Sequence, residues 1–102
     1  MKVISSQRFL DYAIVDEKIE EMKNETSISL PVVNSGLKDN NGEELFILVD
    51  GHHRREGAEE LEINVEYEEV ENEYGVTGDD LLLTCYMDSD WFYIETGKLV
   101  NW

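Results

Sequence analysis

Residues 47–61, ILVDGHHRREGAEEL, decide the fold of this chain. They begin inside the unbroken apolar run of residues 45–49, which predicts a central strand buried on both faces. Gly51 then provides a turn, and the helix formers that follow place Ala58 and Leu61 on one inner stripe. The stretch therefore predicts a strand, a tight turn and a helix in direct succession.

The turn also gathers basic side chains at the start of the predicted helix. Backbone N–H groups at a helix N-terminus lack partners, the helix dipole is positive there, and glycine lets a ligand approach the backbone. Arginine can add a forked hydrogen bond to phosphate oxygens. For Asp50, directly before the turn, two interpretations are open: an acidic group of the site, or a cap of the helix. The candidate phosphate-binding residues are Gly51, His52, His53, Arg54 and Arg55.

The start of the chain predicts a short strand and a helix. Residues 2–9 favour the strand. Apolar residues at i, i+4 and i+7 then mark one stripe of a helix: Val15, Ile19 and Met22. Asp11 or Asp16 can cap this helix, which is expected to end near Asn24.

A hairpin is expected between this helix and the apolar run. Residues 30–33 predict a strand in which Pro31 is tolerable only at the beginning or on an edge. Residues 36–44 are rich in Asn and Gly, which readily adopt positive φ, and they predict the turn of the hairpin.

The second half of the chain predicts a strand, a helix and a final hairpin. Residues 63–68 alternate apolar and polar side chains, as in a half-buried strand with an acidic outer face. Thr77 and Asp80 have capping-box spacing for a helix. Its apolar face would consist of Leu81, Leu82, Cys85 and Tyr86. Residues 90–102 predict either a hairpin turning at residues 96–97 or a second short helix, and we favour the hairpin.

Composition excludes several classes of function. The chain has 102 residues, 24 Asp or Glu against 8 Lys or Arg, and a formal net charge of −16, so one compact domain is expected. Phosphate backbones and anionic lipid surfaces would repel it, so neither direct nucleic-acid binding nor a membrane role is expected. The single Cys85 leaves no internal disulfide, and no apolar run fits a signal peptide or a membrane span. We therefore expect a cytoplasmic protein.

The order of elements and the motif at residues 50–54 resemble the ParB/sulfiredoxin superfamily. The resemblance covers residues 1–70, and residues 71–102 would add a C-terminal helix and the hairpin or short helix. It implies an α+β fold with a small mixed sheet and packed helices. The form DGHHR is similar to the free-serine-kinase branch, where the turn holds nucleotide phosphates and its acid assists phosphoryl transfer.

That branch implies a nucleotide or phosphorylated small molecule as the ligand, with ATP, ADP or CTP and magnesium as the cofactors to consider. Gly51, His52, His53 and Arg54 would hold phosphates, and Asp50 would be the catalytic or metal-directed acid. The branch also takes a catalytic Glu from its early region. The candidates for that role here are Asp16, Glu17, Glu20 and Glu21.

Two other branches of the superfamily match less well. Sulfiredoxins carry a reactive Cys directly after the Gly of the turn, where this chain has His52 and where Cys85 is far away in sequence. Sulfinic-acid reduction is therefore not expected. Partitioning proteins carry G-E-R-R at the turn and continue into helix-turn-helix and dimerisation domains, for which 102 residues leave no room. Sequence-specific DNA partitioning is not expected either.

Acidic residues gather immediately behind the turn. A run of this kind is either an ordinary solubilising surface or a rigid array of carboxylates that imitates a phosphate backbone. The second interpretation predicts an inhibitor of a basic nuclease or other DNA- or RNA-binding protein, of the anti-restriction or anti-CRISPR type encoded on mobile elements. The helix 56–62 and the strand 63–68 would merge their acids into one negative patch. The acidic residues are Glu56, Glu59, Glu60, Glu62, Glu66, Glu68, Glu69, Glu71 and Glu73.

Each basic or reactive residue also has a simpler structural interpretation. Arg54 and Arg55 would pair with local acids on a solvated helix face. His52 and His53 diverge by about 100° on a helix, so a metal site formed by both is not expected. Cys85, on an apolar stripe, is expected to be a small core residue.

Overall fold

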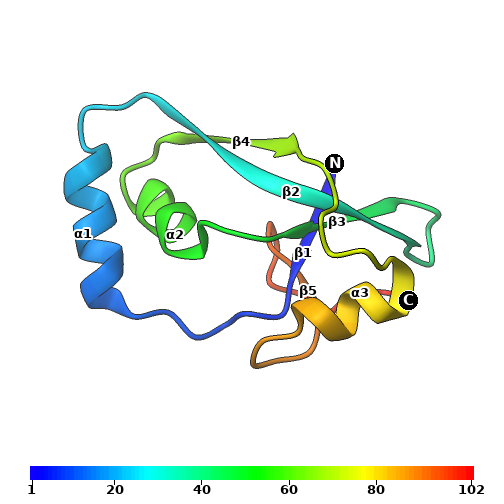
Figure 1. The fold of residues 1–102 in the computed structure, drawn as a ribbon. Helices are drawn as coiled ribbons and strands as arrows, with labels where there is room; N and C mark the ends of the chain where they lie inside the picture. The colour runs from blue at the N-terminus through cyan, green and yellow to red at the C-terminus, as the bar shows by residue number, and fades with distance from the viewer.

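The computed structural model, which describes residues 1–102, contains five strands and three helices (Figure 1). Their order is β1 (Lys2–Ser5), α1 (Tyr12–Met22), β2 (Ser27–Lys38), β3 (Glu44–Leu48), α2 (His52–Glu60), β4 (Asn64–Glu69), α3 (Gly78–Cys85) and β5 (Phe92–Tyr93). The strands form one sheet in the order β4-β2-β3-β1-β5. β1 is parallel to β3 and β2 is parallel to β4, whereas the other two pairs are antiparallel. The predicted α+β class, a small mixed sheet with packed helices, is confirmed.

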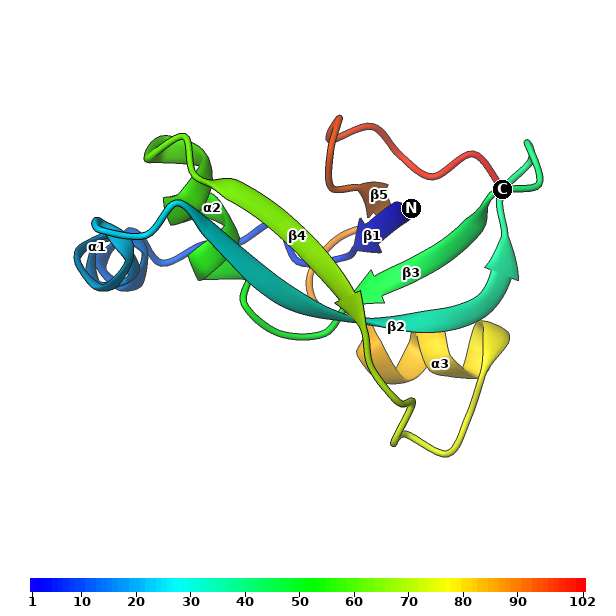
Figure 2. The same cartoon turned by 90° about the horizontal axis from the view of Figure 1, so that it is seen from above.

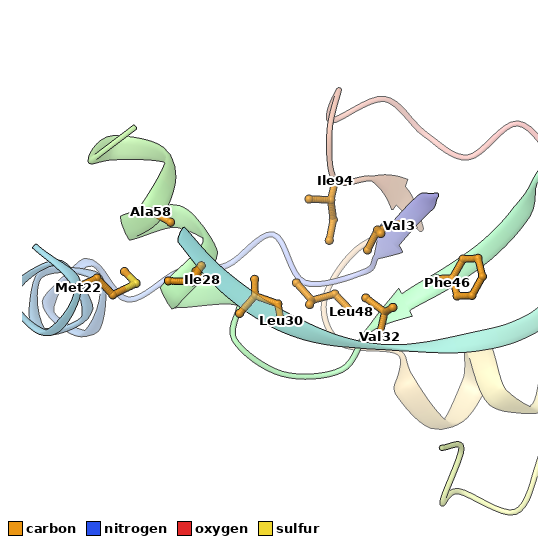
Figure 3. Close-up of a cluster of buried hydrophobic side chains, with 9 residues drawn as sticks. All are labelled: Val3, Met22, Ile28, Leu30, Val32, Phe46, Leu48, Ala58 and Ile94. Carbon is orange, nitrogen blue, oxygen red and sulfur yellow. The ribbon is translucent and has the colours of Figure 1, made fainter. Parts of the chain in front are cut away.

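The two faces of the sheet carry separate apolar clusters. Figure 2 shows α2 and the segment after β5 on one side of the sheet and α3 on the other. The first cluster, drawn in Figure 3, joins the sheet to Met22 of α1, Ala58 of α2 and Ile94. The second cluster packs Leu81 of α3 and Val100 against the opposite face. None of the helices has the length and apolar character that a membrane span requires.

β3 is the central strand that the apolar run predicted. Phe46 and Leu48 belong to the cluster on the α2 side, and Leu45 and Ile47 belong to the cluster on the α3 side. All four are buried, which follows from the alternation of side chains along a strand that has a helix on each face. This strand ends directly before the turn at Gly51.

α1 begins and packs as predicted. Asp11 is its N-cap and accepts a hydrogen bond from the backbone N–H of Ala13 at 3.0 Å. The helix lies against α2 at a glycine, because a Cβ atom on Gly57 would lie 3.0 Å from Met22 Cε and 3.2 Å from Ile19 Cγ1. Gly57 thus permits a close approach of the two helices that a larger residue would obstruct.

Pro31 lies in the middle of β2, with a neighbouring strand on each side, so the prediction of a beginning or edge position was wrong. Its carbonyl oxygen accepts from the N–H of Val49 at 3.4 Å, so the polar backbone atoms of Pro31 face the β3 side. β3 ends at Leu48. The N–H that proline lacks would face the carbonyl of Val49, just beyond the end of β3, so only one hydrogen bond at the end of the ladder is lost and the strand continues through Pro31.

The hairpin between β2 and β3 is confirmed, but its turn is shorter than residues 36–44. β2 runs to Lys38, and the loop comprises residues 39–43. Gly36, with φ of 79°, lies inside β2, where the register with β3 shifts between Asn34 and Lys38. The positive φ of Gly36 therefore belongs to a bulge within β2 and not to the turn of the hairpin.

α3 is confirmed as a helix, but the predicted capping box does not form. Thr77 is the N-cap and makes no side-chain hydrogen bond to the helix. Asp79 and Asp80 in the first turn stabilise the positive end of the helix dipole instead. Leu81 is fully buried, whereas Tyr86 lies beyond the helix and is exposed, so the apolar face is narrower than predicted.

The C-terminal segment forms the favoured hairpin. The N–H of Tyr93 donates to the carbonyl of Lys98 at 2.8 Å, and the N–H of Gly97 donates to the carbonyl of Tyr93 at 2.8 Å. β5 also pairs with β1, through Ile4 and Tyr93. The last residues of the chain thereby complete the sheet beside its first strand.

Candidate functional site

The predicted strand, turn and helix around Gly51 are confirmed. Gly51 is the N-cap of α2 in the left-handed conformation, with φ of 91° and ψ of 21°. A Cβ atom at this position would lie 2.7 Å from Leu30 Cδ2 on the neighbouring strand. Glycine is therefore required twice, by the backbone conformation and by the packing under the turn. β1 and β3 run parallel, so their carboxyl ends meet at the sheet edge where this turn lies, a common place for ligands.

The first turn of α2 has free backbone donors. The first helical hydrogen bond runs from the N–H of Arg55 to the carbonyl of Gly51 at 2.8 Å, and Gly51 has no side chain to cap the helix. The N–H groups of His52, His53 and Arg54 precede that bond and have no partner. Three amide donors and the positive end of the helix dipole thus face the loop side of the turn.

A pocket of about 310 Å³ opens at this turn, and we call it the turn pocket. One wall is the turn itself, and the other comes from α3 and the segments around it. The residues that line it are Gln7, Leu48, Val49, Asp50, Gly51, His52, His53, Tyr74, Thr84, Cys85 and Met87. Its volume is at the lower end of the range for small-molecule sites, which suits a compact polar ligand.

His52 is held at the rim of the turn pocket by β1. Its Nε2 lies 2.7 Å from the hydroxyl oxygen of Ser5, which is buried at the carboxyl end of that strand. Burial lowers the pKa of His52, and repulsion from His53 acts in the same direction, whereas attraction from Asp50 opposes them. His52 is therefore neutral near pH 7 and acts as a positioned hydrogen-bonding group, not as a cation.

His53 connects the same turn to α1. Its Nε2 accepts a hydrogen bond from the backbone N–H of Asp11, the N-cap of α1, at 3.1 Å. The two adjacent rings thus bind different partners on different elements, as expected for neighbouring helical residues. No three or more His, Cys, Asp or Glu side chains gather in an arrangement that could hold a metal ion.

Asp50 is exposed and is the only carboxylate that lines the turn pocket. The interpretation of Asp50 as the helix cap was wrong, because Gly51 occupies the cap position and no side chain bonds to the first turn. Magnesium in nucleotide sites is commonly held by one or two carboxylates together with the phosphates. A single carboxylate beside free amide donors fits a magnesium nucleotide, with Asp50 as the residue that would hold the ion.

The two arginines of the motif, Arg54 and Arg55, differ in the contacts that their side chains make. Arg55 donates to the carbonyl of Ile94 at 3.2 Å and pairs with Glu59 at 3.2 Å, so its side chain points away from the turn pocket. The simpler interpretation, a local ion pair, is thus confirmed for Arg55. Arg54 is half-buried and makes neither an ion pair nor a hydrogen bond. Arg54 is the one free cation on the first turn of α2, but neither arginine is among the residues that line the turn pocket.

Cys85 and Tyr74 enter the turn pocket, although sequence reasoning assigned neither to a site. Cys85 is half-buried and packs against the second apolar cluster, so its interpretation as a core residue is only partly right. Burial raises the pKa of the Cys85 thiol, and the nearby Tyr74 side chain lowers it to a smaller extent. The thiol is protonated near pH 7 and is a poor nucleophile.

The four acidic residues considered for the early catalytic position lie away from the turn pocket. Asp16, Glu17, Glu20 and Glu21 are all exposed on α1, and none of them lines the turn pocket. Glu20 and Glu21 pair with lysines of the same helix, Lys23 and Lys18. α1 approaches the site through the N–H of Asp11 and not through a carboxylate.

The nine acidic residues behind the turn surround one edge of the sheet. β4 is the edge strand, and its half-buried Val65 and Tyr67 pack on the cluster that faces α2. Glu66 and Glu68 point to the other side because strand side chains alternate. Glu59 pairs with Arg55, and the other eight acids make no ion pair. The expected single patch is therefore divided between the two sides of the β4 edge.

Comparisons of this chain with family models, with curated proteins and with solved structures give no match.

Proposed function

We propose that this domain binds a phosphate-bearing small molecule, with a nucleoside diphosphate or triphosphate as the first class to test, at the turn pocket. The observation that carries the proposal is the group of unpartnered amides of His52, His53 and Arg54 at a left-handed glycine. Donors of this kind at a helix N-terminus bind phosphate oxygens. Arg54, which follows the lining residue His53 but does not itself line the turn pocket, supplies the free guanidinium in a chain whose net charge of −16 otherwise opposes anions.

A melting scan with ATP, ADP and CTP, each with and without magnesium, tests this proposal. A ligand at about one hundred times its dissociation constant adds about 2.7 kcal/mol to the free energy of unfolding. Arg54→Ala is expected to remove the shift. Lys38→Ala removes the same charge from an exposed lysine outside the pocket and is expected to keep the shift. If no nucleotide raises the melting temperature of the native protein, the proposal fails.

The resemblance to the kinase branch extends the proposal to phosphoryl transfer at Asp50. As the only carboxylate of the turn pocket, Asp50 is the group that would direct magnesium or assist transfer. Asp50→Asn keeps the shape of the side chain and removes its charge. It is expected to retain ADP binding without magnesium and to abolish the consumption of ATP with free serine. Equal ATP consumption by both proteins would show that Asp50 has no catalytic role.

We also propose a second function, inhibition of a basic nucleic-acid-binding protein, on the observation that eight of the nine acids around β4 lack a cationic partner. Unpaired carboxylates on a rigid edge retain their full field for a basic groove. The test is capture of nucleic-acid-binding proteins at low and high salt, comparing Glu66→Lys/Glu68→Lys with Asp16→Lys/Glu17→Lys. Both pairs change the charge equally, and only the first is expected to abolish salt-sensitive capture. Equal capture by the two variants contradicts this function.

A further inference from the structure

A second, larger cavity lies on the α2 side of the sheet, away from the turn pocket. Its volume is about 740 Å³, and we call it the sheet groove. It is bounded by β1 and β4 of the sheet, by the loop between β2 and β3, and by α2 and the hairpin after β5, the two elements that lie on that side of the sheet in Figure 2. It shares no lining residue with the turn pocket. Its size falls within the range that holds a drug-sized organic ligand.

The floor of the sheet groove is apolar. Ile63, Val65 and Tyr67 of the β4 segment are only half-buried, so part of each side chain remains exposed. Val3 and Ile94 continue this surface toward β5 and are themselves buried in the first cluster. Binding of an aromatic or otherwise flat apolar ligand would bury this strip and be favoured by the hydrophobic effect.

The rim of the sheet groove carries basic as well as acidic side chains. Three of the eight basic residues of the chain line it: Lys2, Arg55 and Lys98. Lys2 and Lys98 form no ion pair, and the ammonium of Lys2 lies 5.9 Å from the centre of the Tyr93 ring. Their N–H donors are therefore free for a ligand.

Two of the acids of the sheet groove are already engaged. The Asp39 carboxylate accepts hydrogen bonds from the hydroxyl of Tyr93 at 2.7 Å and from the N–H groups of Asn41 and Glu43. Glu59 is paired with Arg55. Glu95 is exposed and unpaired. Asp39 keeps its negative charge because its partners are neutral donors, so the lining carries three basic and three acidic side chains. The charged groups still free to bond a ligand are two ammonium groups and one carboxylate. The free donors favour an anionic group on the ligand.

We propose that the sheet groove binds a small organic anion with an aromatic body, its ring on the apolar strip and its anionic group at Lys2 and Lys98. This site is independent of the function proposed for the turn pocket. Anilinonaphthalene sulfonate has this chemistry, and phenylnaphthylamine has the same kind of aromatic body without the charge. Fluorescence titration with the two probes separates the apolar contribution from the ionic one.

The native protein is expected to bind both probes. Lys98→Glu should weaken sulfonate binding and leave binding of the neutral probe unchanged, and Lys2→Glu/Lys98→Glu should weaken sulfonate binding about tenfold or more. Lys38→Glu, with the same charge change outside the sheet groove, should bind both probes as the native protein does. Leu83→Asp, on the exposed apolar side of α3, should also leave both unchanged. Binding of the neutral probe by each variant also reports that it is folded.

Three outcomes contradict the proposal. The first is a native protein that binds neither probe. The second is equal sulfonate affinity for the native protein and Lys98→Glu, which would show that the anionic group lies elsewhere. The third is loss of both probes in Leu83→Asp, which would place the binding surface on α3.

Discussion

The hydroxyl oxygen of Ser5 lies 2.7 Å from Nε2 of His52, and this hydrogen bond joins β1 to the first residue of α2 across 47 positions of the chain. No other acceptor contacts this buried hydroxyl, and its oxygen already accepts from the N–H of Gln7 at 2.9 Å. Its proton therefore goes to His52, whose own proton must lie on Nδ1. The tautomer of a residue in the turn pocket is thus set by a strand that precedes it in the chain.

Ser5→Ala tests this connection. The change leaves Nε2 of His52 and the N–H of Gln7 without partners, so the free energy of unfolding should fall by about 1–3 kcal/mol. Urea unfolding at pH 7.5 measures the loss. Ser29→Ala is the matched control, because Ser29 is an exposed serine of β2 that makes no side-chain hydrogen bond, and it should change the free energy of unfolding little. Equal effects of the two substitutions would show that the Ser5 to His52 bond contributes nothing to stability.

The free energy of unfolding should depend on pH through His52. Its pKa in the folded protein is lowered from 6.5, mainly by burial, so the unfolded chain binds a proton more readily than the folded one. This contribution to stability is fully present above pH 6.5 and is lost as the pH falls below that value. Urea unfolding of the native protein and of His52→Gln, from pH 7.5 to 5.5, should give a difference that shrinks toward acid. A difference that is constant with pH would contradict the lowered pKa.

Gly51→Ala and Gly42→Ala separate backbone strain from steric conflict. Both glycines have positive φ, but a Cβ atom on Gly42 would have no neighbour within 4 Å, whereas one on Gly51 would meet Leu30. Gly42→Ala is expected to cost about 1–2 kcal/mol of unfolding free energy from backbone strain alone. Gly51→Ala should cost about 2–4 kcal/mol because Leu30 must also move. The two values follow from chemical denaturation, and equal values would show that Leu30 moves without cost.

Tyr93→Phe should loosen the loop between β2 and β3. The Tyr93 hydroxyl donates to Asp39 at 2.7 Å, and this bond is the main reason that the pKa of Asp39 is lowered. Its loss should reduce the melting temperature by about 4–8 °C, and NMR titration should show the Asp39 pKa rising toward 3.8. Tyr86→Phe removes an exposed hydroxyl that makes no hydrogen bond and should change neither value. An unaltered Asp39 titration in Tyr93→Phe would contradict this assignment.

Sequence reasoning located the elements that local patterns determine. The apolar run ending at Leu48, the glycine at position 51 and the alternation around Val65 each act over a few residues, and the corresponding strand, turn and edge strand are present. Pro31 was misplaced because its tolerance depends on where β3, a different segment, ends. Because β3 is a different segment of the chain, the residues around Pro31 in the sequence could not indicate its position in β2.

The candidate site was predictable in its backbone and only partly in its side chains. The turn carries the free amides that its glycine indicated, but Arg55 turns toward Ile94, 39 positions away. Tyr74 and Cys85 reach the turn pocket only because α3 packs on the sheet. The only sequence feature that could have indicated Ser5 was its position at the end of the first strand. This position points to the turn only once β1 is known to run parallel to β3.

The parallel pairing of β1 with β3 has a consequence for how the chain folds. Among the five strands only β2 and β3 pair with each other through a local hairpin, whereas Ile4 must find Ile47 and later Tyr93 to acquire its neighbours. Contacts of such separation form late and slowly, since the intervening chain loses entropy before any bond is gained. During synthesis β1 emerges before the other strands, and it stays unpaired for longer than any of them. The pocket residues at its carboxyl end are therefore assembled among the last parts of the molecule.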